Sequence, residues 1–377
     1  MAFCIAAGPL AAATLPAFPE RLRIDRLRLA GDGWHTGTFA LAADLLRRGA
    51  GGFEMTGRLT LGDAELATFR FGREDHSPYI RIETPTLGIG SRGVPAEQLF
   101  APLPKPLRTL SGLLEAGLVL APSASPESRA WLVLRDGAAE VDGVRLAGIE
   151  TRLSFDSLNP LRSLPGQSLR VHRIVVGSSE GSLEALFDLG EGTRLAVRQA
   201  ALALWGGRIE LQPVALDLGH PDGTLVADIA AIDLREIAAV FGNGRLRAEG
   251  VLDGTARIRL TLPQGWVAEA VQLRARSAGT LGWSGELPAT SDPRLALVRD
   301  LLQDFHYRRL EARLDGPLAG ALALRVTLEG ANPAVLGGYP VALDLRFEGP
   351  LGRVLLQGVA GDPLPTGLGE RLWRSLR

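Results

Sequence analysis

The sequence lacks most of the residues on which catalytic, metal-binding and nucleic-acid-binding proteins depend. Cys4 is the only cysteine, which excludes a disulfide framework and a cysteine-based metal site. The formal net charge is -1, so there is no basic excess of the kind that nucleic acid requires. Aromatic residues make up only 6% of the chain. No stretch reaches the about 18 uninterrupted apolar residues expected of a transmembrane helix.

Motifs for chemistry are also missing. The three Gly-x-Gly stretches, which begin at Gly31, Gly88 and Gly242, lack the strand and helix that flank a dinucleotide-binding loop. Asp300 and Asp304 lie one helical turn apart, which is more typical of a solvated helix face than of a carboxylate pair. The five histidines show no metal-ligand spacing: His35, His76, His172, His220 and His306. We therefore predict no catalytic residue, no metal and no cofactor.

What the sequence does contain is a series of strands that are apolar on one side only. In Ala321–Glu329 the residues alternate between apolar and polar or small side chains, and Val341–Glu348 repeats the pattern. A period of two over this length predicts β-strands that bury one face. Similar segments, separated by Gly, Asp-Gly or Pro-containing turns, recur along most of the chain.

The predicted fold is mainly β: an elongated, curved antiparallel sheet that forms an open hydrophobic groove, with a few short helices. A compact sandwich would concentrate large apolar residues at its centre, whereas here they are spread evenly and the chain has 46 glycines, which permit bends and bulges. The expected helices are a pair near residues 94–120 (the second over Leu107–Ala116), Asp233–Phe241 with Asp233 as N-cap, and Asp292–Phe305. A turn is expected at Asp136-Gly137.

Composition predicts three parts. Residues 1–120 form an N-terminal β segment, residues 129–360 a β-groove domain, and residues 361–377 a tail, with the Pro/Ser-rich stretch 121–128 between the first two. The stretch Met1–Pro19 is Ala-rich and has no basic residue. Two interpretations remain open for it: Met1 lies inside a longer natural protein, which we favour, or the stretch is a weak export signal.

An open apolar face predicts a surface that shields lipid chains from water. At about 0.8 kcal/mol per methylene, exposing roughly 30 methylenes of a phospholipid would cost on the order of 25 kcal/mol. The alternative is a structural or scaffolding protein of the cell envelope with a closed core. The residues predicted to line the groove are Ile258, Leu260, Leu322, Leu324, Val326, Leu328, Val341, Leu343, Leu345 and Phe347.

Several short motifs, in order and spacing, resemble the C-terminal part of the YdbH-type proteins, which belong to the AsmA-like group and have also been labelled a dicarboxylate transport domain. The match extends over roughly residues 139–356. The residues that carry it include Gly166-Gln167, Gly206-Gly207, Asp304-Phe305 with Tyr307, and Asn332-Pro333. We interpret these as structural motif residues.

The resemblance implies intermembrane phospholipid transport along a β-sheet trough that crosses the periplasm from an inner-membrane anchor. It also implies that the C-terminal end binds an outer-membrane lipoprotein by strand addition, at Val341–Glu348 or at Arg353–Leu356. Family members are usually longer and begin with an anchor, so the resemblance also suggests that this chain is a fragment of a longer membrane-anchored protein. Asp344 stands where the family pattern suggests Asn.

Overall fold

In the computed structural model, the chain is described over most of its length, and the text below refers to these residues only. The described residues are 21–27, 30–31, 34–35, 39–48, 52–74, 77–99, 107–120, 129–141, 144–158, 161–190, 194–217, 222–241, 244–261, 265–284, 293–318 and 321–349. The predicted tail 361–377 and the second candidate edge strand, Arg353–Leu356, lie outside them.

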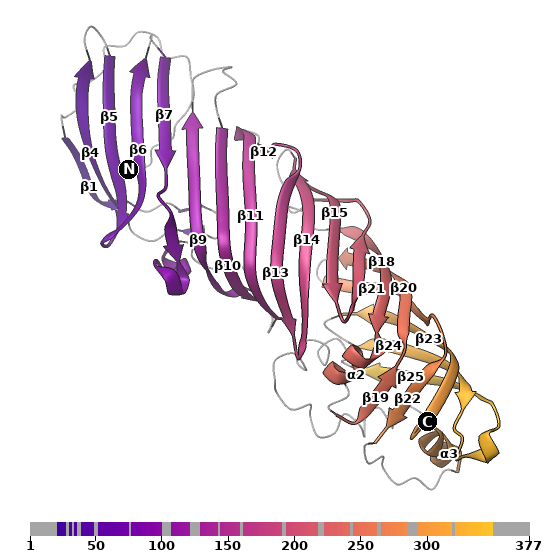
Figure 1. Cartoon of the computed structure of the whole chain (residues 1–377). Helices are drawn as coiled ribbons and strands as arrows, with labels where there is room; N and C mark the ends of the chain where they lie inside the picture. The colour runs from indigo at the N-terminus through magenta and orange to yellow at the C-terminus, as the bar shows by residue number, and fades with distance from the viewer. Residues whose placement is uncertain are drawn as a thin grey trace.

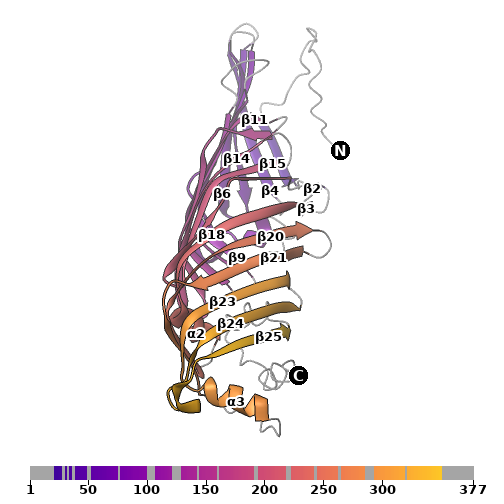
Figure 2. The ribbon, with the colours of Figure 1, turned by 90° about the vertical axis from the view of Figure 1, so that its right-hand side faces the viewer.

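Nearly all described strands belong to one 23-stranded sheet, which is long and curved (Figures 1 and 2). Its N-terminal strands are β1 (Arg21–Leu27), β4 (Phe39–Arg48), β5 (Gly52–Leu61), β6 (Ala64–Glu74), β7 (Ser77–Glu83), β8 (Leu87–Ile89), β9 (Leu107–Leu120), β10 (Arg129–Val141), β11 (Val144–Leu158) and β12 (Leu161–Ser163). The sheet continues with β13 (Gln167–Val176), β14 (Ser179–Leu189), β15 (Arg194–Leu204), β16 (Gly207–Leu211), β17 (Val214–Asp217), β18 (Gly223–Asp233), β19 (Leu246–Glu249) and β20 (Val251–Thr261). It ends with β21 (Gly265–Ala275), β22 (Gly279–Trp283), β23 (Phe305–Pro317), β24 (Leu322–Ala331) and β25 (Val341–Gly349).

The remaining described elements are small. They are the β2–β3 hairpin (Ala30–Gly31 with Trp34–His35), the helices α1 (Ala96–Leu99), α2 (Leu234–Phe241) and α3 (Pro293–Leu301), and the 3-10 turns η1 (Gly90–Arg92) and η2 (Leu336–Gly338). Among the described residues, no helix is long and apolar enough to cross a membrane.

The topology is a meander in which strands pair mainly with their sequence neighbours. The antiparallel pairs run in order from β4–β5 through β9–β10, β13–β14 and β20–β21 to β24–β25. Within the described residues the sheet does not close on itself: the residue pairings join β1 to β4 and β25 to β24, and give neither strand a second partner. The predicted open, curved sheet is therefore confirmed, and the closed core of the scaffold alternative is not present in the described part.

Each strand separates its side chains onto two faces. In β14, Leu183 and Ala185 point to one face, and Glu184 and Leu186 to the other. We call these the apolar face and the polar face. The polar face carries cross-strand ion pairs such as Arg170 with Glu184, whose side chains are both more than half exposed. Such exposed pairs add little stability, but they keep this face hydrated.

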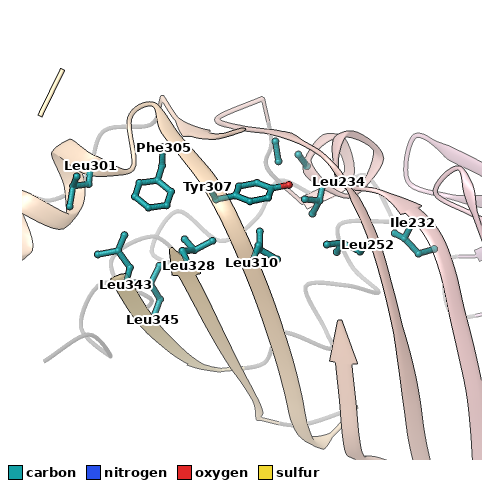
Figure 3. Packing of buried hydrophobic residues seen from close by; sticks show 12 residues of the cluster. Ile232, Leu234, Leu252, Leu301, Phe305, Tyr307, Leu310, Leu328, Leu343 and Leu345 are labelled. Carbon is teal, nitrogen blue, oxygen red and sulfur yellow. The ribbon is translucent and has the colours of Figure 1, made fainter. Parts of the chain in front are cut away.

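Buried residues gather where helices or strong bending cover the apolar face. The largest cluster joins α2 and α3 to strands β18–β25, and Phe305, Tyr307 and Leu328 are almost fully buried in it (Figure 3). A second cluster surrounds α1 and β8, with Ile89 at its centre. A third lies in the middle of the sheet around Val171.

Three local predictions are wrong. Leu107–Ala116 is part of strand β9, not a helix: its leucines have helical spacing, but pairing with β7, β8 and β10 on its two sides overrides that local preference. Asp136-Gly137 is a bulge inside β10, with φ of 49° at Asp136, and not a turn. Helix α3 ends at Leu301, and Phe305 already begins β23.

The helix predicted at Asp233–Phe241 is confirmed as α2. Asp233 accepts a hydrogen bond from the backbone N–H of Arg235 at 2.8 Å, which is the role of an N-cap. The predicted boundary 121–128 lies outside the described residues, and β9 and β10 pair directly on either side of it.

Candidate functional site

The strongest candidate for a functional surface is a band of apolar side chains that crosses the sheet from strand to strand. Directly paired residues on the apolar face form two neighbouring rows that run perpendicular to the strands, and we call the two together the apolar track. Row A contains, from β25 to β10, Leu345, Val326, Ala312, Leu273, Gly254, Ile229, Ile209, Leu202, Leu183, Val171, Ile149 and Gly137. Row B contains, from β25 to β8, Phe347, Leu324, Leu314, Val271, Ala256, Ala227, Leu211, Ala200, Ala185, Leu169, Thr151, Leu134, Leu114 and Leu87.

Neither row contains a charged residue, and Thr151 is the only polar one. At about 4.8 Å per strand, row B extends for roughly 60 Å along the sheet. Toward the N-terminus the apolar face continues in a further row of paired residues: Phe155, Ala130, Leu118, Ile82, Phe69, Gly57 and Ala43. The track is therefore longer than any single lipid chain.

Part of the track is accessible. In its middle, Leu183, Leu202 and Ile209 are half-buried, whereas Val171 and Ile149 of the same row are buried in the third cluster. At the β25 end the neighbouring residues are sealed by α2 and α3. The track thus has a helix-covered end and a partly exposed middle.

The ten residues predicted to line the groove lie in β20, β24 and β25, with side chains on the apolar face. Six of them are half-buried: Ile258, Leu260, Leu324, Val326, Val341 and Phe347. The other four are buried: Leu322, Leu328, Leu343 and Leu345. Leu328 and Leu343 pack in the cluster beneath α2 and α3, so their contacts in the structure are with the protein core (Figure 3).

Sequence reasoning did not single out the middle of the track. Leu183, Leu202, Ile209 and Ile229 come from four different strands, and only the strand register brings them into one line. The signal available in the sequence was the alternation within each of these strands. That alternation shows which face a residue occupies, but not which residue lies beside it.

The motif residues Phe305 and Tyr307 fix the helix-covered end of the track. The Tyr307 hydroxyl donates a hydrogen bond to the Glu249 carbonyl oxygen at 2.7 Å, and the side chain is 1% exposed. A Cβ at Gly250 would lie 1.9 Å from this hydroxyl, and one at Gly279 would lie 2.4 Å from it. Burial raises the pKa of Tyr307, so the hydroxyl stays protonated and keeps its hydrogen bond.

The motif residue Asn332 ties α3 to the end of β24. Its side-chain amide donates to the carbonyl oxygens of Asp300 at 2.9 Å and Leu301 at 3.2 Å, and its carbonyl oxygen accepts from the backbone N–H of Ala334 at 2.9 Å. Asn332 is 2% exposed, so each of these bonds takes the place of a hydrogen bond that its side chain would otherwise make with water. Pro333 follows it at the start of the connection to β25.

The other motif residues shape turns. Gln167 is buried and accepts a hydrogen bond from the backbone N–H of Ser154 at 2.7 Å, while Gly166, at φ of 74°, donates its N–H to Asp188 at 2.6 Å. Gly206 (φ of 71°) turns the β15–β16 hairpin, and a Cβ at Gly207 would lie 2.5 Å from the Ala230 carbonyl oxygen. These contacts indicate structural roles.

Asp304 is one of the exposed members of the motif set. Its carboxylate lies 3.3 Å from the His306 imidazole, next to the start of β23. Within the described residues, no group of three or more His, Cys, Asp or Glu side chains could hold a metal ion.

Two hollows have linings rich in charged side chains, although each also includes apolar-face positions: Ala43, Gly57 and Phe69 in the first, and Leu134, Thr151, Leu169 and Ala185 of row B in the second. One, of about 570 Å³, is lined by residues of β1 and β4–β7 that include five arginines, among them Arg58 and Arg81. The other, of about 520 Å³, lies over β10–β16, with Arg170 and Glu184 in its lining. Their charged linings fit water and ions better than acyl chains.

The last described strand, β25, forms one edge of the sheet. Its polar-face residues Asp344, Arg346 and Glu348 are exposed. A hydrogen bond from the Arg325 guanidinium lowers the pKa of Asp344, with Nε and Oδ1 2.9 Å apart. The predicted Asn-to-Asp departure at this position thus gives a cross-strand ion pair on the polar face.

Comparison with known proteins identifies the family. The family described as YdbH-like, intermembrane phospholipid transport protein YdbH, matches residues 5–358. The match extends well beyond the 139–356 expected from the motifs and includes the N-terminal strands. No curated protein and no solved structure matches the chain. With a long open β-sheet and a family match over nearly its whole length, the chain belongs to the YdbH-like family of intermembrane phospholipid transport proteins.

Proposed function

We propose that this protein conducts phospholipids between the inner and outer membranes, in the periplasm, with the acyl chains lying on the apolar track. The observation that carries the proposal is the continuity of the track: paired apolar residues follow one another from β25 to β8 without a charged residue. Exposing the apolar face of an open sheet to water costs free energy, unless an apolar ligand covers that face at least part of the time.

The energetics favour a surface of this kind. A phospholipid crossing water would expose about 30 methylenes at a cost on the order of 25 kcal/mol, and a continuous apolar surface removes much of that cost. Because the sheet is open, the headgroup can stay in water while the acyl chains contact the track. Movement along a uniform surface needs no bond to be made or broken, so the proposed transport is not enzymatic.

The proposal is tested by purifying the protein from cells and analysing bound lipid by mass spectrometry, combined with site-specific photo-crosslinking. A photoreactive phenylalanine analogue replaces Leu202, which belongs to row A. In the control the same analogue replaces Gln199, which lies in the same strand but on the polar face. We expect phospholipid crosslinks at Leu202 and few at Gln199. Equal crosslinking at both positions, or protein that contains no phospholipid, would refute the proposal.

We further propose that β25 accepts a strand from an outer-membrane lipoprotein. The support is that β25 is paired with β24 alone in the described sheet, so one of its two edges is unpaired there. Strand addition at this edge would place the partner next to Leu345 and Phe347, where both rows of the track end.

A further inference from the structure

The connection between β24 and β25, residues Asn332–Pro340, presents two large apolar side chains to solvent. We call it the β24–β25 loop. Tyr339 is 73% exposed and Leu336 is 54% exposed, the two highest values for large apolar residues in the described part of the chain. The loop and its flanks, residues 330–343, contain no charged residue. Two exposed apolar side chains on one uncharged loop form a small apolar surface.

The loop is held in a defined shape. Buried Asn332 fixes its start through hydrogen bonds to Asp300, Leu301 and Ala334. Within the loop, the backbone N–H of Gly338 donates to the Val335 carbonyl oxygen at 3.0 Å. The exposure of the two side chains therefore follows from an ordered backbone.

That backbone is unfavourable for one of the two exposed residues. Leu336 has φ of 52°, and Gly337 and Gly338 follow with φ of 62° and 77°. This left-handed region suits glycine, asparagine or aspartate and disfavours leucine. Because Leu336 is also exposed, folding gives no reason for a leucine here, and strain at an exposed residue is typical of a functional position.

We propose that the β24–β25 loop inserts Leu336 and Tyr339 into the interfacial layer of a phospholipid bilayer. A tyrosine ring is favoured at the headgroup level and a leucine side chain among the upper acyl segments, and an uncharged loop avoids the cost of desolvating a charge there. A stable protein interface usually buries about 1,200 Å² or more, which two side chains do not supply, whereas a shallow bilayer contact needs only a few apolar side chains.

This inference rests on the proposed function. The loop leads directly into Val341, the first residue of β25, and the two rows of the track end in the same strand at Leu345 and Phe347. Contact of the loop with a bilayer would bring the end of the track to the membrane that supplies or receives the lipid.

The test is flotation of the whole chain with vesicles of phosphatidylethanolamine and phosphatidylglycerol. The variant carries Leu336→Asn and Tyr339→Ser, because asparagine tolerates the left-handed backbone and so preserves the loop. The matched control is Leu186→Asn, which removes a 41% exposed leucine from the polar face of β14. We expect the loop variant to lower vesicle partitioning about ten-fold or more, since partial burial of each side chain is worth a several-fold change. The control should bind like the parent protein, with thermal unfolding unchanged in all three.

Parent protein that does not float, or a loop variant that floats as well as the parent, would overturn the proposal. So would a loop variant that changes self-association in gel filtration but not vesicle binding, since the surface would then contact a second copy of the chain. Bound phospholipid, measured in the same preparations, separates this inference from the proposed function. Protein that contains phospholipid but does not float contradicts the loop contact alone, and protein that floats but contains no phospholipid contradicts the transport proposal alone.

Discussion

A charge in the middle of the apolar track should block lipid movement more than it harms the fold. Leu183→Glu places a carboxylate in row A, between the paired positions of Val171 and Leu202. Leu183 is half-buried, so the glutamate can reach water while the track is empty. When an acyl chain passes, the carboxylate must lose water or the chain must leave the track.

The size of the effect follows from the cost of a charge in a lipid environment. Insertion measurements assign about 3 kcal/mol to a charged residue among acyl chains. Each increase of about 1.4 kcal/mol in an activation free energy slows a rate ten-fold, so transport along the track should slow by about 10²-fold. The stability cost at a half-buried leucine should be about 1–2 kcal/mol, which leaves the protein folded.

The assay measures transfer of a fluorescent phospholipid from donor to acceptor vesicles, with urea unfolding of the same samples. The control is Leu186→Glu, which places the same charge in the same strand on the polar face, where Leu186 is 41% exposed. Equal loss of transfer in both variants would show that the effect is general. Normal transfer in Leu183→Glu would show that lipid does not follow row A, and the reasoning would be wrong.

Further predictions concern the helix-covered end and the edge of the sheet. Gly250→Ala should destabilise the protein by about 2 kcal/mol or more in urea unfolding, because its Cβ would lie 1.9 Å from the Tyr307 hydroxyl. Gly244→Ala, also at positive φ but with no atom within 4 Å, should cost only about 1 kcal/mol, and a similar loss in both would contradict the steric explanation. A side-chain hydrogen bond from Arg235 is the main cause that lowers the pKa of Asp233 in the folded protein. The ionised Asp233 therefore stabilises the folded protein above the pKa of an unfolded aspartate, near 3.9, and this stabilisation is lost as the pH falls through the lower pKa of the folded state. Asp233→Asn should therefore remove part of the acid sensitivity of unfolding measured from about pH 6 to about pH 3, and an unchanged pH profile would argue against this contribution. Leu345→Pro should abolish capture of an outer-membrane lipoprotein at β25 while circular dichroism remains β-rich, and undiminished capture would refute strand addition there.

Features that depend on a few neighbouring residues could be predicted from the sequence. The alternation of Leu324 and Leu328 with polar residues fixed the faces of β24, and the capping position of Asp233 fixed the start of α2. Even spreading of apolar residues and abundant glycine correctly indicated an open sheet. These signals are local, because both periodicity and capping act within a few residues.

Features that depend on distant pairing could not be predicted. Leu107–Ala116 carries helical spacing, and only its pairing with three other strands makes it extended. Ile229 and Gly254 become neighbours in row A through the register of β18 with β20, which includes a bulge after Ile229. A one-residue slip would move either side chain to the other face, so no single strand contains enough information to define the track.

The sequential order of the strands has a consequence for how such a protein can change in length. Because most strands depend on the hairpins just before and after them, an added or deleted pair of strands would disturb only its immediate surroundings. Inserting one hairpin in the middle would lengthen the sheet by roughly 10 Å while both ends kept their local contacts. A sheet built in this way can therefore gain or lose hairpins, and so change in length, while the strands at its two ends keep their contacts.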